Sequence, residues 1–95
     1  PVAVGVTAAA HGVPLRSALH AYLHAFAANL VSAGVRLVPL GQNAGQRALA
    51  TLEAPVQALA ETAETATLDD LGGCAWVAEI CSMRHETQYT RLFRS

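Results

Sequence analysis

The sequence predicts an all-α fold, arranged as an antiparallel helical bundle fragment with a C-terminal tail. Alanine dominates the chain, and it favours the helix more strongly than any other residue. The Val, Ile, Phe and Trp residues never alternate with polar ones over several positions, as they would in a half-buried strand. Between residues 15 and 37, large apolar residues recur at intervals of three and four, which is typical of a helix.

The first two helices are bounded by glycine and proline. A first helix, over residues 2–11, is predicted to stop at Gly12, because glycine readily adopts the left-handed conformation that ends many helices. Pro14 suits the first position of a second helix, which the pattern extends to Leu37. Val38 precedes Pro39, and the residue before a proline disfavours helix.

The second helix is apolar or small around most of its circumference. One face carries large side chains at helical spacing: Leu15, Leu19, Tyr22, Phe26, Leu30 and Leu37. Another face carries small ones: Ser17, Ala21, Ala25, Ala28 and Ser32. Because small residues let a neighbouring helix approach closely, this pattern predicts a central, buried helix.

A third helix is predicted after a turn at residues 39–43. Asn43 is expected to cap its first turn, since an Asn side chain accepts hydrogen bonds from unpaired helix amides. The helix then covers residues 44–65, with Pro55 expected to kink or divide it near Ala54. The short turn implies that the second and third helices pack antiparallel.

The chain divides into a helical body, residues 1–73, and a C-terminal segment, residues 74–95. Asp69 and Asp70, followed by two glycines, break the helical pattern between them. The C-terminal segment holds the single Trp and three of the six Arg residues.

Composition restricts the class of function. Of the 95 residues, 53% are hydrophobic and 14% are charged, whereas ordinary domains carry about 25% charged residues. Surface is therefore expected to be hidden against partners or against a missing N-terminal half, and the start at Pro1 suggests a piece of a longer protein. The net charge of −1, with no Lys, disfavours nucleic-acid binding. No signal peptide or membrane span is recognisable. Because the two thiols, Cys74 and Cys81, do not make a disulfide framework, we expect a reducing, cytoplasmic compartment.

Two constellations could bind metal. His20 and His24, one helical turn apart, could share a metal ion, or they could be packed or surface histidines. Cys74 and Cys81 are too far apart in sequence for a usual zinc motif, and we interpret them as small apolar residues. His85 is the remaining weak metal candidate.

No catalytic motif is recognisable, so we expect a protein that is not an enzyme. The stretch from Gly41 to Gly45 has no Lys and is not a phosphate loop. A hydrolase with an unrecognised site remains the alternative from another class, although no nucleophile–base pair supports it.

The end of the chain has the composition of a binding surface, although it could also be an ordinary frayed terminus. Arg and Tyr are enriched where proteins bury hot spots against partners. Arg84, Arg91 and Arg94 can each bind a carboxylate through a guanidinium fork. The apolar anchors expected beside them are Met83, Tyr89, Leu92 and Phe93.

The same residues resemble a known family. The run from Ser82 to Ser95 resembles the C-terminus of the urease accessory proteins of the UreF family. Weaker matches carry the resemblance along the chain: Ala21-Tyr22-Leu23, Ala27-Ala28-Asn29-Leu30, Val38-Pro39-Leu40-Gly41-Gln42 and Gly45-Gln46-Arg47. Cys74 and Cys81 depart from the family pattern. The family is also about twice as long as this chain, so the resemblance is to its C-terminal portion.

The resemblance implies an all-α, often dimeric scaffold that catalyses no reaction itself. Family members bind UreD (UreH in some organisms) and the GTPase UreG, and the assembly acts on apo-urease to insert nickel. No tightly bound cofactor is implied, although nickel could pass through. The partner-binding residues implied here are Arg84, His85, Glu86, Tyr89, Arg91, Phe93 and Arg94. Gly41, Gln42 and Arg47 are further candidates for the same surface. Direct nickel binding through His20 and His24, or through His85, is the alternative.

Overall fold

The computed structural model describes residues 1–38 and 40–89, and within these ranges the chain forms helices and no strand. The predicted all-α class is therefore confirmed. The α-helices are α1 (Val2–Ala10), α2 (Leu15–Leu37), α3 (Gly41–Thr65) and α4 (Trp76–Arg84). Two single turns of 3-10 helix, η1 (Leu68–Asp70) and η2 (His85–Thr87), follow α3 and α4.

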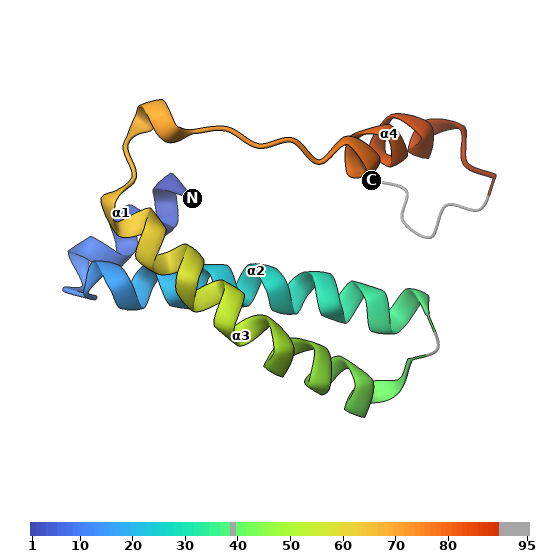
Figure 1. Ribbon diagram of the computed structural model, residues 1–95, viewed down its shortest axis with the longest axis horizontal. Helices are drawn as coiled ribbons and strands as arrows, with labels where there is room; N and C mark the ends of the chain where they lie inside the picture. The colour runs from blue at the N-terminus through green and yellow to red at the C-terminus, as the bar shows by residue number, and fades with distance from the viewer. Residues whose placement is uncertain (39, 90–95) are drawn as a thin grey trace.

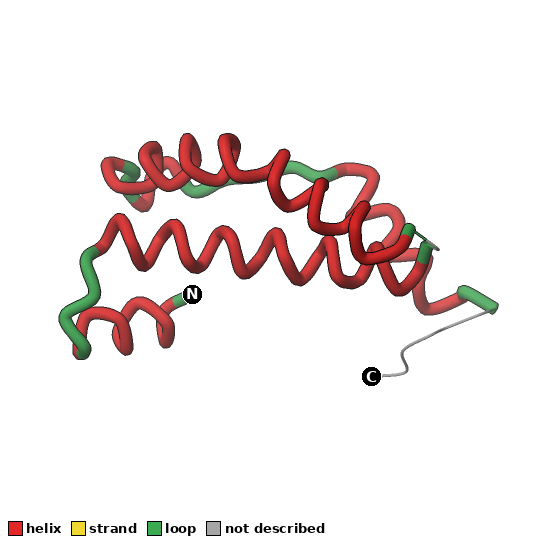
Figure 2. The backbone as a smooth tube through the Cα atoms, turned by 90° about the horizontal axis from the view of Figure 1, so that it is seen from below, coloured by secondary structure: helices red, strands yellow, loops and turns green. Residues whose placement is uncertain are grey.

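Helices α2 and α3 form an antiparallel hairpin, as predicted (Figures 1 and 2). The short α1 folds back along the first part of α2. This arrangement leaves most of the length of α2 in contact with α3 on one side only.

The predicted ends of α1 and α2 are confirmed. Gly12 has a φ of +69°, and the amide of Val13 donates to the carbonyl of Ala8 at 2.9 Å, so the chain reverses there. At the start of α2 the prediction is off by one residue, because Pro14 is the N-cap and Leu15 is the first helical residue. At the other end Val38 is extended, with φ −119° and ψ 136°, as expected for a residue before proline.

The prediction for the start of α3 was wrong. The helix begins at Gly41, and Asn43 lies inside its first turn instead of capping it. Gly41 has a φ of +69°, so the change of direction is made by this glycine, two residues before Asn43. The helix is also continuous through Pro55, which does not divide it. Pro55 and Thr51 are both exposed, so the Thr51 carbonyl that loses its amide partner can face water.

The buried core of the described chain is small. Val56 and Ala60, one turn apart on α3, are its buried hydrophobic residues. Gly45, also buried, lets α3 approach α2 closely. A Cβ atom at Gly45 would lie 2.8 Å from Cγ2 of Val35.

The prediction that α2 is a buried, central helix was wrong for the described chain, in which no residue of α2 is buried. The large side chains of its apolar face remain open: Leu15, Tyr22, Phe26, Leu30 and Leu37. The physical reason is that α3 covers the opposite side, and only the short α1 reaches the apolar one.

Helix α4 stands apart from the hairpin. Residues 71–75 form an extended, exposed connection, which Figure 1 shows as the irregular segment leading into α4. Among the described elements, α4 contacts η2 and none of α1, α2 or α3. The segment that we expected to be a tail is therefore partly helical. Within the described ranges, every helix is too short or too polar to cross a membrane.

Candidate partner-binding surface

The described part of the C-terminal segment is exposed throughout. Among the described elements only η2 contacts α4, and every residue of the helix is exposed. Trp76 is 72% exposed, Met83 is 70% exposed, and Tyr89 is fully exposed. Large apolar side chains in this position cost free energy until something covers them.

The structure describes four of the predicted partner-binding residues of this segment. Arg84 is the last residue of α4, His85 and Glu86 belong to η2, and Tyr89 follows it. The hydroxyl of Thr87 donates to the carbonyl of Arg84 at 3.2 Å, which holds η2 against the end of α4. The other predicted residues, Arg91, Phe93 and Arg94, and the anchor Leu92, lie outside the described residues.

Three apolar residues of α4 were not among those predicted to bind a partner. Trp76, Val77 and Ile80 are exposed on α4 beside Met83. Trp76, Ile80 and Met83 are spaced i, i+4 and i+7, the pattern of a helix that binds a groove through one face. That spacing was readable in the sequence, where we described the segment only as a C-terminal tail.

The second group of predicted residues lies elsewhere, at the closed end of the hairpin. Gly41 and Gln42 begin α3, and Arg47 follows one and a half turns later; all three are exposed. Figures 1 and 2 place this turn and α4 toward the same end of the long axis. No contact joins α3 to α4 among the described residues, so the structure does not merge the two groups into one surface.

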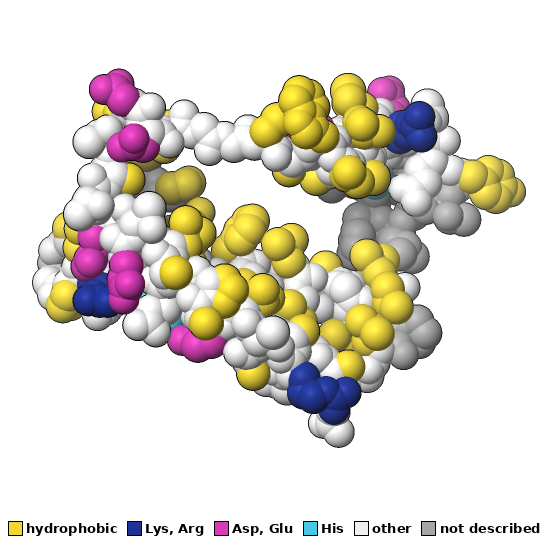
Figure 3. Space-filling model, in the orientation of Figure 1, with side chains coloured by type: hydrophobic (Ala, Val, Ile, Leu, Met, Phe, Trp, Pro, Cys, Tyr) yellow, Lys and Arg dark blue, Asp and Glu magenta, His cyan; other side chains and the backbone are white. Residues whose placement is uncertain are grey.

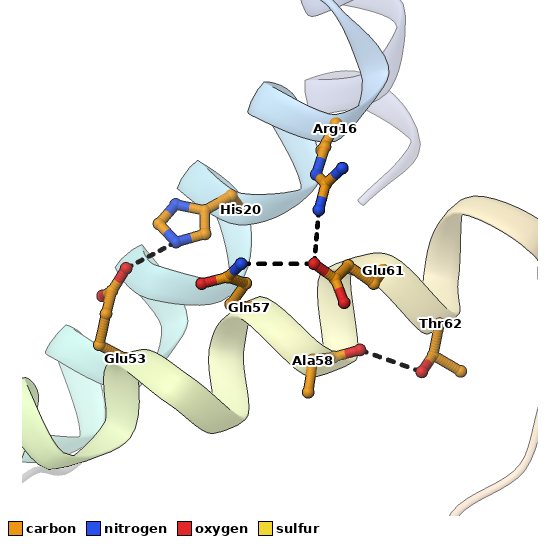
Figure 4. Close-up of polar contacts among 7 residues, drawn as sticks. All are labelled: Arg16, His20, Glu53, Gln57, Ala58, Glu61 and Thr62. Carbon is orange, nitrogen blue, oxygen red and sulfur yellow. Dashed lines mark hydrogen bonds and ion pairs between the residues drawn. The ribbon is translucent and has the colours of Figure 1, made fainter.

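The two histidines of α2 have a carboxylate partner on α3. Nε2 of His20 lies 2.8 Å from Oε1 of Glu53, and Nδ1 of His24 lies 3.6 Å from Oε2. Figure 4 shows His20 directed across the helix interface toward Glu53. One turn earlier on α2, Arg16 pairs with Glu61 at 2.5 Å. These polar contacts join α2 to α3 along one edge of the hairpin.

This cluster does not form a metal centre as it stands. Across residues 1–38 and 40–89, no group of three or more His, Cys, Asp or Glu side chains is arranged to hold a metal ion. The two imidazoles instead face one carboxylate, that of Glu53, which gives their ring nitrogens a polar partner without a metal ion. Cys74 and Cys81 are exposed free thiols.

A shallow hollow of about 350 Å³ borders the same cluster, and it is lined by Arg16, Ser17, His20, Gln57 and Ala60. It brings a Ser and a His near each other, as a hydrolase would require. However, Nε2 of His20 is hydrogen-bonded to Oε1 of Glu53, and no hydrogen bond joins Ser17 to His20 in the described structure. The hollow therefore lacks an activated nucleophile.

Comparison with known proteins decides the family. The UreF family model matches residues 1–53, more than half of the chain. The chain belongs to the UreF family. A relative from Bradyrhizobium diazoefficiens, named urease accessory protein UreF, is 62% identical over all 95 residues. Relatives of the same name from Rhodopseudomonas palustris strains BisB5 and TIE-1 are each 60% identical over the same length.

This UreF chain is much shorter than those relatives. It spans 39% of the Bradyrhizobium protein and 40% of the TIE-1 protein. The family match ends at residue 53, within α3. Similarity to the relatives continues beyond it, through α4 and the end of the chain.

Proposed function

We propose that this chain is part of a urease accessory protein that joins UreD (or UreH) and UreG in the complex that inserts nickel into apo-urease. In this role it acts as a scaffold, regulates the GTPase and catalyses no reaction of its own. The name shared by the relatives supports the urease role. The proposal places this work in the cytoplasm, where exposed thiols such as Cys74 and Cys81 stay reduced.

The observation that carries the proposal is the exposed C-terminal segment. Helix α4 presents Trp76, Ile80 and Met83 without an apolar neighbour in the rest of the described chain. Burying a side chain of this size stabilises a complex by about 1.5–3 kcal/mol. Arg84 and Tyr89 supply the polar groups that set orientation at a typical interface. A segment of this kind binds by covering its apolar face with a partner.

The decisive experiment removes Met83–Ser95 from the full-length protein. We expect co-purification with UreD or UreG to be lost, while the helical circular dichroism signal of the body is kept. Two point variants sharpen the assignment: Trp76→Ala and Tyr89→Ala should each weaken binding at least tenfold. Thr62→Ala, on an exposed position of α3, serves as the matched control. Undiminished binding by the deleted protein would contradict the assignment of this segment.

Nickel enters this proposal as cargo in transit. Imidazole is a suitable nickel ligand, and His20, His24 and Glu53 come together across the hairpin. Among the described residues these side chains do not form a group of three or more arranged to hold a metal ion, so the proposal treats them as transient ligands. Calorimetry with nickel on the His20→Ala, His24→Ala double variant distinguishes the cases. An unchanged nickel affinity would exclude both histidines as ligands, and an affinity at least tenfold lower would support them as ligands.

The proposed working form is a homodimer of the full-length protein. Sedimentation of the full-length protein without partners measures this oligomeric state. A dimer is expected because the described chain alone leaves much apolar surface exposed.

A further inference from the structure

Two cysteines border the first part of the exposed helix α4. Cys74 lies in the connection, two residues before α4 begins at Trp76, and Cys81 lies within the helix. Both are exposed free thiols, and they are the two cysteines of the chain. Figure 3 shows hydrophobic side chains over α4 on the face turned toward the viewer. The segment between the two thiols therefore includes the start of the apolar surface that is proposed to bind a partner.

The intact helix keeps the two thiols apart. Ala75 is the N-cap of α4, and its carbonyl accepts a hydrogen bond of 2.9 Å from the amide of Glu79. From Ala75 to Cys81 the helix rises by about 9 Å. Cys74 lies farther out, in the extended connection that leads away from the helix in Figure 1. A disulfide needs Cα atoms within about 7 Å of each other, so these cysteines can join only if the first turns of α4 unwind.

Unwinding α4 costs little while no partner covers it. The helix has nine residues, and among the described elements it contacts η2 alone. Its N-cap residue, Ala75, makes no side-chain hydrogen bond to the first turn. Isolated helices shorter than about 12–15 residues are only marginally stable in water. The helix therefore opens often enough for the two thiols to meet.

We propose that Cys74 and Cys81 form a reversible disulfide that unwinds the start of α4 and switches off partner binding. The oxidant is glutathione disulfide. One cysteine thiolate attacks it, which forms a mixed disulfide and releases one glutathione thiolate. The other cysteine thiolate attacks the protein sulfur of the mixed disulfide, which closes the Cys74–Cys81 bond and releases the second glutathione thiolate. The two protons lost by the cysteines go to the released thiolates, so two protein thiols are oxidised and one glutathione disulfide is reduced to two thiols.

The closing step is favoured because it occurs within one chain. Six residues separate Cys74 from Cys81, and closing a loop of this length costs little entropy. The effective concentration of the second thiol is in the millimolar range, above that of a second copy of the protein. Exposed disulfides are also the ones that are easily reduced again. The bond is therefore internal and reversible.

The disulfide and the bound partner exclude each other. Binding through α4 needs Trp76, Ile80 and Met83 on one face of an intact helix, and the disulfide removes the helix between the first two of them. A partner that covers α4 holds the helix closed, so it should in turn slow oxidation. The effect on binding rests on the proposed function, whereas formation of the disulfide does not.

Oxidation of the purified full-length protein tests whether the disulfide forms. Every cysteine other than these two is replaced by serine, and the protein is treated with glutathione disulfide at submicromolar concentration. Peptide mass spectrometry should find Cys74 joined to Cys81, and dithiothreitol should reverse the reaction. Ala78→Gly, at an exposed position of α4, weakens the helix and should speed closure at least twofold. In guanidinium chloride, where no helix persists, the same substitution should leave the rate unchanged.

Binding of UreD or UreG to the same protein tests the consequence. The oxidised form should bind at least tenfold more weakly than the reduced form, and reduction should restore the affinity. Cys81→Ser is the matched control, because it keeps the thiol outside the helix but cannot close the bond. Its affinity should stay within twofold with or without glutathione disulfide.

Four results would overturn the proposal. A stable mixed disulfide, or a disulfide between two copies, would replace the internal bond. Closure that is no faster in Ala78→Gly would show that α4 does not have to unwind. Equal binding by oxidised and reduced protein would remove the switch, and an equal loss in Cys74→Ser would assign it to glutathione on Cys81. Failure of the proposed function looks different, since the reduced protein would then bind neither UreD nor UreG while the disulfide is still measured.

Discussion

Asp70 shows how a single residue closes the 3-10 turn that follows α3. Oδ2 of Asp70 accepts hydrogen bonds of 2.8 Å from both the backbone amide and the hydroxyl of Thr67. The amide, and then the hydroxyl, lower the pKa of the Asp70 carboxyl below its ordinary value of 3.8. The predicted turn at Asp69 and Asp70 is therefore a 3-10 turn closed by its own side chain.

This lowered pKa predicts the pH range in which the turn holds. A carboxyl whose pKa is lower in the folded state stabilises the fold above its unfolded pKa and loses that contribution as pH falls. We expect η1 to loosen below about pH 4. In an NMR titration, the Asp70 carboxyl carbon should have a midpoint below 3.8. Thr67→Val should raise this midpoint only in part, because the backbone amide at position 67 still donates its hydrogen bond to Asp70. A midpoint at or above 3.8 for the Asp70 carboxyl would contradict the stabilisation of its charged form by Thr67.

At the scale of elements, the hairpin depends on one close approach and one polar edge. Gly45 brings α3 against Val35 and Val31 of α2. The contacts of Glu53 and Glu61 with α2 lie along the edge shown in Figure 4. Side chains in these pairs are about half exposed, so each contributes less than about 1 kcal/mol. Packing at Gly45 therefore matters more to the hairpin than its ion pairs.

Replacing Gly45 with Ala tests this packing. The new methyl group would press on Val35, whose branched side chain has little freedom to move. Overpacking costs about 1–3 kcal/mol, against a gain of about 1 kcal/mol in helix propensity. Gly34→Ala is the control, since nothing lies within 4 Å of its added methyl. In urea unfolding of the full-length protein, Gly34→Ala should be the more stable variant by at least about 1 kcal/mol. Equal stability would refute the close approach.

At the scale of the whole molecule, the described chain places α4 apart from α1–α3, with residues 71–75 between them. The connection is extended and exposed, and it includes Gly72 and Gly73. The body offers the α2 face, and the C-terminal segment offers α4. Both are exposed apolar surfaces.

Limited proteolysis of the full-length protein should cut outside the helices of the body first. Chymotrypsin cleaves after large apolar and aromatic residues, and exposed irregular backbone is its preferred substrate. Leu71 and Tyr89 meet both conditions, whereas Tyr22 and Phe26 lie within α2. Mass spectrometry should find early products ending at Leu71 or at Tyr89. An early cut within α2, ahead of both sites, would contradict this expectation.

Much of the fold was predictable because the signals are local. Gly12 and Val38 end their helices through their own backbone preferences, and the large apolar residues of α2 recur at helical spacing. Asn43 misled the prediction, because Gly41 makes the turn two residues earlier. Pro55 does not divide α3, and a kink there stays a prediction. Four of the predicted partner-binding residues in the C-terminal segment are exposed, but binding by them stays a prediction.

The sequence by itself determined the helical class, the hairpin and the family resemblance, since propensity, turn residues and motif spacing act over a few neighbouring positions. The tertiary structure alone decided that His20 and His24 meet Glu53, that α4 stands away from the body, and that α2 keeps an open face. These facts depend on which distant residues the chain brings together. Packing between helices is a property of the whole assembly, and no local pattern specifies its partner.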